Sequence, residues 1–427
     1  MELRTPRGMR DFLPEEMNMR EELFDKIRAI FRSYGYEPLE TPALEELEIL
    51  TLKCGEDTNK QIFRVEEKLG LRFDLTVPLA RVMASRLDIP KPFKRYCISR
   101  VWRREEPQKG RYREFWQADI DIIGSSHIGA EAELVACASE CLRAVGIDKF
   151  NVRINDRRIL EAAFLEMGVE KGKLLDAFRA IDKLEKIGVE GVRKELATHS
   201  ISETHIEKII RFISISGTND EKLRKAREFL EKQGGGKHLD GIKELLRLIS
   251  TYGYGDFITV DFSLARGLDY YTGTVFEISC SGGAGSIGGG GRYDGLIGAY
   301  GGVQMPAVGI SLGVERIFDI LKKESLAKRT RVLLYIAPVS AELYNAGILI
   351  AQKFRSMHVP CEIDLMGRPL KKQFEYANAR GIPFVAVVGD REIKENMITL
   401  RSLETGEEKK VSTEDAAKII LQNSGIP

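Results

Sequence analysis

The sequence predicts an α+β protein made of an antiparallel-sheet part with a helical insertion and a C-terminal α/β part. Three observations predict this fold class. Residues 93–123 read as two strands around a turn-rich loop, residues 156–250 are dense in Lys and Glu with apolar residues at helical spacing, and strands alternate with helices from residue 332 onward. We therefore expect domains at 1–150 with 251–325, at 151–250 and at 328–427.

Chain length, net charge and cysteine content restrict the class of protein. A chain of 427 residues suits two or three domains, and a net charge of +1 argues against a protein that coats nucleic acid. Six cysteines without a CxxC pair indicate thiols in a reducing compartment. The charged N-terminus and the lack of a long apolar run predict a cytoplasmic protein with no secretory signal and no membrane span.

The most informative segment is the predicted hairpin between Phe93 and Gly124. Its return strand alternates apolar residues with three polar ones, and its loop is rich in cations. The polar residues are Gln117, Asp119 and Asp121; the cations are Arg103, Arg104, Lys109, Arg111 and Arg113. Cations suit a polyphosphate, whereas carboxylates and an amide suit an amine or an imidazole. The alternative is a solvated surface hairpin.

This hairpin resembles a known family. Arg103-x-Glu105 followed by Pro107-Gln-Lys-Gly-Arg-Tyr-Arg-Glu-Phe-Trp-Gln117 resembles the second signature motif of class II aminoacyl-tRNA synthetases, in the form found in histidyl-tRNA synthetases. The resemblance extends over nearly the whole chain. It implies a catalytic domain built on an antiparallel sheet, followed by an anticodon-binding domain.

The N-terminal elements fit this resemblance. A helix is predicted from Pro14 to about Gly35, and residues 37–45 resemble the first class II motif, which forms the homodimer interface in that family. A plain amphipathic helix is the alternative. Residues 70–81 predict a short strand that leads into a helix. By resemblance Asp74 and Thr76 would hold the substrate α-ammonium; the alternative is that Thr76 caps the helix.

The middle of the chain holds two further motifs that match the family. A helix at 128–145, a strand at 150–155 and the charged helical insertion precede a strand at 257–262. The family's insertion contacts the tRNA acceptor stem. Arg266-Gly-Leu-Asp-Tyr270-Tyr271 then matches the histidine-specific signature, which implies that Arg266 is a catalytic arginine and that Tyr270 and Tyr271 line the imidazole pocket. Core packing is the alternative for the tyrosines.

The glycine-rich segment 282–296 is the second histidine-family signature, and it contains a misleading pattern. Gly283-x-Gly285-x-x-Gly288 spells a dinucleotide-binding fingerprint. A dinucleotide fold would need a helix and a second parallel strand next, but the glycines continue to Gly291. Glycines that let backbone approach a small substrate are the better interpretation.

The C-terminal third completes the resemblance. Residues 307–318 resemble the third class II motif, a strand followed by a helix, with Arg316 expected at the γ-phosphate; a solvent-facing arginine is the alternative. Strands at 332–338, 361–364 and 384–389 alternate with helices, which predicts a largely parallel sheet. Residues 367–377 resemble an anticodon-binding domain, with Arg368, Lys371 and Lys372 either phosphate contacts or neutral surface.

The resemblance implies a histidine–tRNA ligase that uses histidine, ATP, Mg²⁺ and tRNA(His) as a homodimer. Catalysis would fall to Arg103 and Arg266, with Arg316 and Arg113 at the γ-phosphate and Glu105 facing the adenine amino group or a metal. Histidine would be held by Asp74, Thr76, Gln117, Asp121, Tyr270 and Tyr271. No protein metal ligand is assigned, since Mg²⁺ would be bound through the ATP phosphates.

The sequence departs from the family motif at one position, and two alternative functions remain open. Family members often carry Glu where Asp121 stands, so the contact with the imidazole is either direct or through a bridging water. The first rival function is a non-catalytic, synthetase-like regulatory or tRNA-sensing protein, and the second is a dinucleotide-dependent oxidoreductase.

Overall fold

The computed structural model describes residues 3–108, 110–230, 235–266, 270–280, 285–324 and 330–424. Lys109, Asp269 and Gly283, which belong to the motifs of the sequence analysis, lie outside these residues. The chain divides into two compact units, residues 1–10 with 23–324 and residues 11–22 with 325–427. Each unit is described separately.

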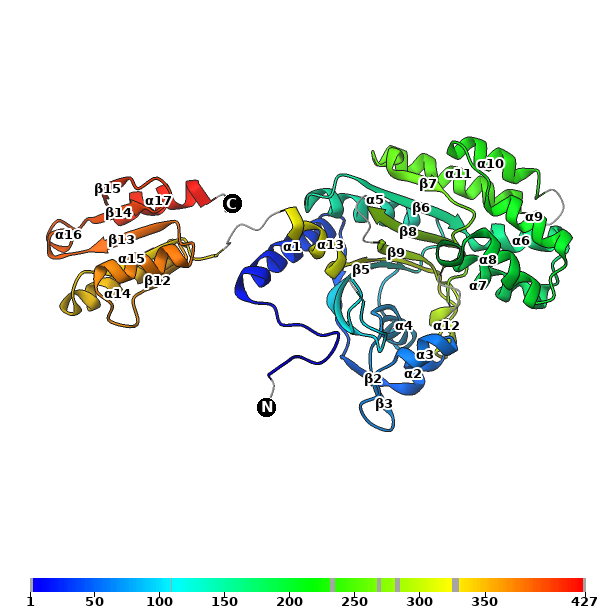
Figure 1. The fold of residues 1–427 in the computed structure, drawn as a ribbon, viewed down its shortest axis with the longest axis horizontal. Coiled ribbons are helices and arrows are strands. Elements are labelled where there is room, and N and C mark those ends of the chain that lie inside the picture. Colours follow the sequence, from blue (N-terminus) through cyan, green and yellow to red (C-terminus); the bar gives the residue numbers. More distant parts are fainter. Residues whose placement is uncertain are drawn as a thin grey trace. The chain divides into compact units, whose positions relative to one another are not determined.

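The first unit is built on an eight-stranded sheet of order β1-β4-β5-β10-β9-β8-β6-β7 (Figure 1). In this sheet, only the two edge pairs among the described strands, β1 with β4 and β6 with β7, are parallel. The six central strands pair with one another in antiparallel fashion, as the sequence predicted. The strands are β1 (Glu37–Pro38), β4 (Phe93–Trp102), β5 (Glu114–Ile123), β6 (Phe150–Asp156), β7 (Ile258–Val260), β8 (Thr274–Cys280), β9 (Ser286–Arg292) and β10 (Ala307–Gly313). β2 (Leu44–Glu46) and β3 (Leu69–Leu71) form a small separate pair.

The predicted hairpin is confirmed over its full length. β4 and β5 pair from Phe93 opposite Ile123 to Trp102 opposite Glu114. Ten-residue antiparallel strands form here because β-branched and aromatic residues dominate β4 and because β5 alternates apolar with polar positions. Both faces of β5 are buried from Gln117 onward, so its polar face is not a solvated surface.

One face of the central sheet is covered by helix. α5 (Gly129–Ala144) packs on β5 and β10, and α11 (Gly236–Thr251) packs on α5. Buried residues of β5 and β10 meet α5 on this side: Ala118, Ile120, Ile122, Val308, Ile310 and Leu312. α13 (Val314–Glu324) packs against β5 and β9. The alternate residues of the same strands therefore point to the opposite face, which carries the candidate site.

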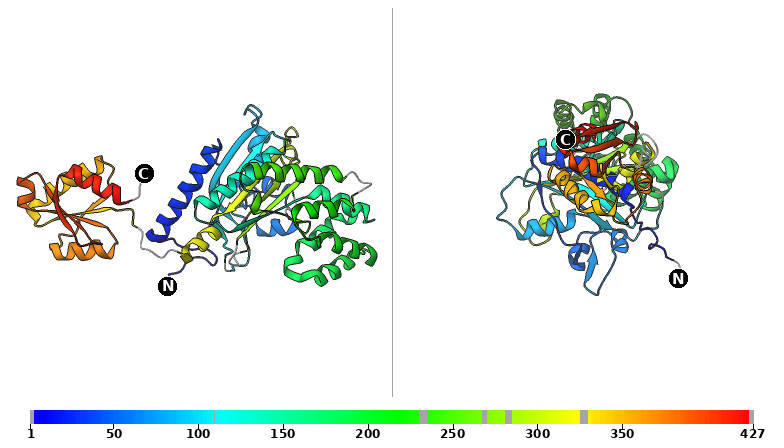
Figure 2. Two further views of the ribbon diagram at one scale, coloured as in Figure 1. Left: turned by 90° about the horizontal axis from the view of Figure 1, so that it is seen from above. Right: turned by 90° about the vertical axis from the view of Figure 1, so that its left-hand side faces the viewer.

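The predicted helical insertion follows β6 directly. Its helices gather beside the β6–β7 edge of the sheet (Figures 1 and 2). They are α6 (Arg157–Glu166), α7 (Leu174–Asp182), α8 (Leu184–Thr198), α9 (Glu203–Ile213), α10 (Asn219–Arg227) and α11. Their buried positions recur at helical spacing, for example Ile206, Ile209, Ile210 and Ile213 on α9. The remaining helices are α1 (Pro14–Ser33), α2 (Leu47–Thr51), α3 (Glu56–Gln61), α4 (Thr76–Ser85) and α12 (Leu296–Ala299).

The second unit is a three-layer α/β fold with sheet order β12-β11-β13-β14-β15. α14 and α17 share a core on one face, and α15 packs on the other. Its elements are β11 (Leu334–Pro338), α14 (Tyr344–Ser356), β12 (Cys361–Ile363), α15 (Leu370–Ala379), β13 (Phe384–Val388), α16 (Asp390–Lys394), β14 (Ile398–Ser402), β15 (Glu408–Val411) and α17 (Thr413–Ser424). The α/β class is confirmed. A largely parallel sheet is wrong, because β14 and β15 add antiparallel pairings.

Candidate active site

A cavity of about 390 Å³ lies on the free face of the central sheet. It is lined by every site residue that the sequence predicted except Arg113: Asp74, Thr76, Arg103, Glu105, Gln117, Asp121, Arg266, Tyr270, Tyr271 and Arg316. These residues come from segments that are up to about 240 positions apart in the chain, and the sheet brings them together. Its volume is within the range of small-ligand sites.

The cavity floor is built from three neighbouring strands. Gln117, Asp119 and Asp121 of β5 pair with Gly313, Ser311 and Gly309 of β10. A Cβ atom at Gly309 would lie 2.1 Å from the Asp121 Oδ1 atom, which is far inside van der Waals contact. A Cβ at Gly291 of β9 would lie 3.0 Å from the Tyr271 ring. Glycines therefore leave room above the floor for the acids and for the tyrosine.

Asp121 is held in a buried ion pair. Arg95 Nη1 lies 2.9 Å from Asp121 Oδ2, and the side chains are 0% and 2% exposed. The Tyr293 hydroxyl donates to the other oxygen of Asp121 at 2.6 Å. Burial raises the pKa of Asp121, while Arg95 and Tyr293 oppose that shift. Both oxygens of this carboxylate thus have protein partners.

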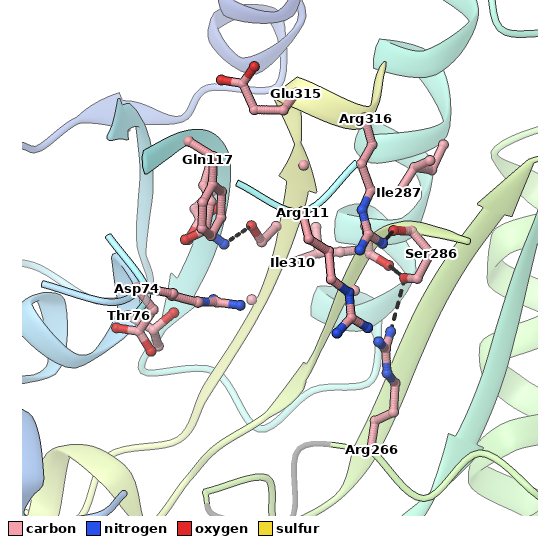
Figure 3. A pocket seen from close by; sticks show the side chains of 18 of the residues that line it. Asp74, Thr76, Arg111, Gln117, Arg266, Ser286, Ile287, Ile310, Glu315 and Arg316 are labelled. Carbon is pink, nitrogen blue, oxygen red and sulfur yellow. Dashed lines mark hydrogen bonds between the residues drawn. The ribbon is translucent and has the colours of Figure 1, made fainter. Parts of the chain in front are cut away.

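Asp74 and Thr76 occupy another side of the cavity (Figure 3). Asp74 Oδ1 accepts a hydrogen bond from the Val77 N–H at 3.0 Å, so this carboxylate caps α4. Thr76 is the first residue of α4 and makes no capping hydrogen bond, so the alternative that Thr76 caps the helix is wrong. Burial raises the pKa of Asp74 to about 6, although the capping N–H and the nearby Arg103 counteract part of that effect.

Cationic side chains gather on the opposite side of the cavity. Arg266 Nη1 donates to Ser286 Oγ at 2.9 Å, and Arg316 donates to the Ser286 carbonyl and to the Gly110 carbonyl. Figure 3 shows Arg111, Arg266 and Arg316 close together around Ser286. Partial burial and the neighbouring guanidinium groups of Arg111 and Arg266 lower the pKa of Arg316. Such a cluster is stabilised when an anion binds between its members.

Arg103 is fixed near the acidic side. Its Nε donates to the Phe73 carbonyl at 3.0 Å, and its guanidinium lies 5.1 Å from the centre of the Phe115 ring. These two contacts hold the side chain over the sheet rather than out in the loop. Arg103 and Arg266 both line this one cavity.

The loop residues Glu105 and Arg113 contact each other through the backbone. Arg113 Nε donates to the Glu105 carbonyl at 2.8 Å, and the Arg113 guanidinium lies 3.9 Å from Glu106. Glu105 lines the cavity, with its carboxylate 3.7 Å from Arg111. Arg113 does not line it in this structure, so its contact with the γ-phosphate remains a prediction.

The tyrosine pair closes one end of the cavity. The rings of Tyr270 and Tyr271 meet edge to face with centroids 4.7 Å apart, and Tyr270 meets Tyr293 in the same way at 6.2 Å. Burial raises the pKa of both tyrosines, so they stay neutral near pH 7. Neutral hydroxyls and aromatic edges suit a small polar ring.

Sequence reasoning missed several residues of the site. Asp119 was noted as part of the polar face of the strand, yet received no role; Arg95, Tyr293, Ser286 and Ser311 were not considered. The alternation in β5 was a usable signal for Asp119, because it lies between two residues that were chosen. No such signal existed for Arg95, which becomes relevant only through its pairing across β4 and β5.

Metal ligands from the protein are sparse. Over the ranges that the structure describes, no group of three or more His, Cys, Asp and Glu side chains is arranged to hold a metal ion. Glu105 and Glu315 line the cavity, but Glu315 already pairs with Arg10 at 2.6 Å. This donor set fits a Mg²⁺ ion that arrives bound to phosphates. No helix in the described residues is long and apolar enough to cross a bilayer.

The antiparallel sheet, with arginines from its hairpin loop, from the segment before β8 and from α13 meeting at one cavity, defines a class II aminoacyl-tRNA synthetase. The sequence pattern described as Histidyl-tRNA synthetase matches residues 8–317, and that described as Anticodon binding domain matches residues 334–423. The chain belongs to the histidyl-tRNA synthetase family.

Individual relatives agree with this. A protein named Histidine--tRNA ligase from Aeropyrum pernix is 41% identical over 98% of this chain and 97% of its own length. The crystal structure of histidyl-tRNA synthetase from Nostoc sp. PCC 7120 superposes with a TM-score of 0.88 at 32% identity, covering 99% of this chain and 100% of that one. A structure from Bacillus halodurans C, titled as an ATP phosphoribosyltransferase regulatory subunit/histidyl-tRNA synthetase, has a TM-score of 0.76 at 24% identity over 88% of this chain and 96% of its own, and therefore shares the fold.

Proposed function

We propose that this protein is a histidine–tRNA ligase, which activates histidine with ATP and transfers it to the terminal adenosine of tRNA(His). Family membership supports the class of reaction. The observation that carries the proposal for this chain is the polarity of the cavity, with carboxylates and tyrosines at one end and arginines from three distant segments at the other. An amino acid with a basic side chain and a triphosphate have complementary charges at these two ends.

In the first step a histidine carboxylate oxygen forms a bond with the α-phosphorus of ATP. The bond from that phosphorus to the oxygen that bridges to the β-phosphate breaks, and pyrophosphate leaves. Both reactants are anionic, so the protein's task is to neutralise charge and align the groups rather than to form a covalent intermediate. We assign Arg103 and Arg266 to the α-phosphate and Arg316 to the γ-phosphate.

The other assignments follow from the motifs, and all of these residues except Arg113 line the cavity. Glu105 faces the adenine amino group and Arg113 assists at the γ-phosphate. Asp74, Thr76 and Gln117 receive the α-ammonium, and Asp121, Tyr270 and Tyr271 line the end of the cavity where the imidazole would lie. Mg²⁺ bound to the distal ATP phosphates would supply further charge neutralisation. In the second step a ribose hydroxyl of the terminal adenosine attacks the carbonyl carbon, and AMP leaves.

We further propose that the C-terminal unit binds the anticodon, that the chain forms a homodimer through the segment 37–45, and that it works in the cytoplasm. Arg368, Lys371 and Lys372 differ in whether their charges are free to contact a tRNA phosphate. Lys372 pairs with Glu375 at 2.6 Å and the Arg368 guanidinium lies 3.4 Å from Asp364, so both would have to exchange a carboxylate for a phosphate. Lys371 is exposed on the first turn of α15.

Histidine-dependent exchange of pyrophosphate into ATP tests the function. The wild-type protein should catalyse it with histidine and not with the other amino acids. Arg266→Ala should lower the rate by about 10²–10³-fold, because it removes one charge-stabilising group from the transition state. Arg247→Ala is the matched control, since Arg247 pairs only with Glu244 on the exposed surface of α11.

The control variant should retain full exchange and the wild-type unfolding temperature, and Arg266→Ala should still unfold cooperatively, because the buried Glu277 with which Arg266 pairs keeps its second partner, Arg153. A wild-type protein without histidine-dependent exchange would contradict the function and would favour the regulatory or tRNA-sensing alternative. Full activity in Arg266→Ala would remove Arg266 from the catalytic machinery while leaving the function intact.

A further inference from the structure

Two buried acceptors on the cavity floor have unused hydrogen-bonding capacity. Within the described residues, Gln117 Oε1 and Asp119 Oδ1 have no hydrogen-bond partner. Their residues are only 9% and 3% exposed, and both line the cavity. A buried polar atom without a partner costs about 1–3 kcal/mol, so native proteins retain such atoms mainly where a ligand or water completes them.

The other acids at this end of the cavity are already engaged. Asp121 has Arg95 on one oxygen and the Tyr293 hydroxyl on the other. Asp74 accepts from the N–H of Val77. Asp119 has a hydrogen bond with the Ser311 hydroxyl, and the charge of Arg95 also lowers its pKa. Ser311 in turn accepts from Gln117 Nε2 at 2.7 Å. Burial and the nearby charge of Asp121 raise the pKa of Asp119 to about 7.

The positions of the two open acceptors match the donors of histidine. Gln117 and Asp119 are two residues apart on one strand face, so their side chains emerge roughly 7 Å apart. Histidine carries hydrogen-bond donors at both ends, the α-ammonium and a ring N–H. An amide oxygen suits the first donor at the side of the cavity where Asp74 lies, which leaves the carboxylate of Asp119 for the ring.

We propose that Asp119, rather than Asp121, is the specificity-determining residue that accepts a hydrogen bond from the imidazole ring of the substrate. Asp121 is a positioning residue, which ties Arg95 of β4 and Tyr293 to the floor of the pocket. This assignment rests on the proposed histidine activation. It also explains why the protein retains a buried carboxylate oxygen without a partner despite the cost in stability. A neutral residue at 119 would discriminate less against substrates whose side chains lack a ring N–H.

The test replaces Asp119 by Asn, which keeps the shape and one acceptor but removes the charge. Asp119→Asn should raise the KM for histidine in pyrophosphate exchange by about 10- to 100-fold, the range for loss of a charge-assisted hydrogen bond, and should leave the KM for ATP unchanged. Asp88→Asn is the matched control, an exposed acid that pairs with Arg86 outside the cavity. It should alter neither constant.

The pH dependence provides a second readout that a merely structural role would not produce. Below the pKa of Asp119, the wild-type carboxyl is protonated and resembles the neutral amide. Above it, only the wild type offers an ionised acceptor. The ratio of the two KM values for histidine, variant over wild type, should therefore rise as the pH increases from about 6 to 8.

Methylated substrates locate the contact. In the wild type, either 1-methylhistidine or 3-methylhistidine should bind much less tightly than histidine, because one of them lacks the N–H that faces residue 119. In Asp119→Asn, methylation at that position should lower the affinity by a smaller factor than in the wild type. The effects of methylating the substrate and of replacing Asp119 are then not additive. Additive losses for both analogues would place the ring away from Asp119.

Three outcomes separate the possibilities. If Asp119→Asn folds, as judged by thermal unfolding, and keeps the wild-type KM for histidine, the assignment is overturned. Equal increases in the KM for histidine and for ATP overturn it as well. If Asp119→Asn does not fold, Asp119→Ser provides the same comparison with a smaller side chain. A wild-type protein with no exchange at all contradicts the proposed function instead.

Discussion

Three aspartates of the cavity show how neighbours give one side chain different chemistry. Asp74 caps a helix, Asp121 is neutralised by a buried arginine, and Asp119 has an oxygen without a partner in the described structure. Burial raises the pKa of all three, yet only Asp121 has a full cationic partner. Each acid therefore responds differently to substitution.

At the residue scale, the Arg95–Asp121 pair gives a stability prediction. Arg95→Met should lower the free energy of unfolding by about 3–5 kcal/mol, because it leaves a buried carboxylate without its cation. The double variant Arg95→Met with Asp121→Asn should recover part of this loss, since the uncompensated charge is gone. Urea denaturation measures both. A double variant less stable than Arg95→Met would show that the pair does not act as one unit.

At the element scale, glycines give the sheet its open floor. β9 is a strand with four consecutive glycines, from Gly288 to Gly291, between β8 and β10. Glycine normally weakens a strand because it adds backbone entropy in the unfolded chain and no packing. Here Gly288 and Gly289 line the cavity, and because they carry no side chains they leave space in which a ligand fits.

Gly309→Ala tests this role of the floor. The new Cβ would meet Asp121 Oδ1, which Tyr293 and Arg95 hold in place, and the Ile120 carbonyl at 3.1 Å. We expect a loss of about 1–3 kcal/mol in stability and a raised KM for histidine. Gly241→Ala is the control, because its Cβ would meet no atom within 4 Å on helix α11. It should stabilise the protein by about 0.5–1 kcal/mol. Equal effects of the two substitutions would contradict the steric argument.

At the scale of the whole molecule, the candidate active site and the segment that matches an anticodon-binding domain lie in separate units. The cavity lies entirely within the first unit, from Asp74 to Arg316. The second unit has cores of its own on both sides of its sheet. This separation suggests that adenylate formation and tRNA recognition can be lost independently.

Removing residues 328–427 tests that independence. Histidine-dependent pyrophosphate exchange should persist, because no cavity residue is removed. Transfer of histidine to tRNA should weaken at least about tenfold in kcat/KM, the equivalent of about 1.4 kcal/mol of lost binding. Charging assays over a range of tRNA concentrations measure the difference. Undiminished charging by the truncated protein would contradict the proposed anticodon contact.

The elements were largely predictable because their signals are local. The alternation in residues 114–123 predicted β5, and the spacing of apolar residues predicted the helices of the insertion. β15 was missed because its exposed charged residues at 408–411 carry no apolar period, and β14 was missed because its alternation extends over only five residues. A helix cap by Thr76 was the alternative that the sequence left open, and the cap lies at Asp74 instead because the position of a helix start is uncertain by a residue or two from sequence.

The sequence by itself determined the family, the motifs and a set of site residues of which all but Arg113 line the cavity, because each motif is a contiguous run whose residue types are dictated by the chemistry they serve. Only the tertiary structure decided how the acids divide their roles. Whether Asp119 or Asp121 is available to a ligand depends on Arg95 and Tyr293, which are 26 and 172 positions from Asp121 in the chain and reach it only when the sheet has formed. Local patterns carry no record of such a contact, since burial and partnership are properties of the folded molecule.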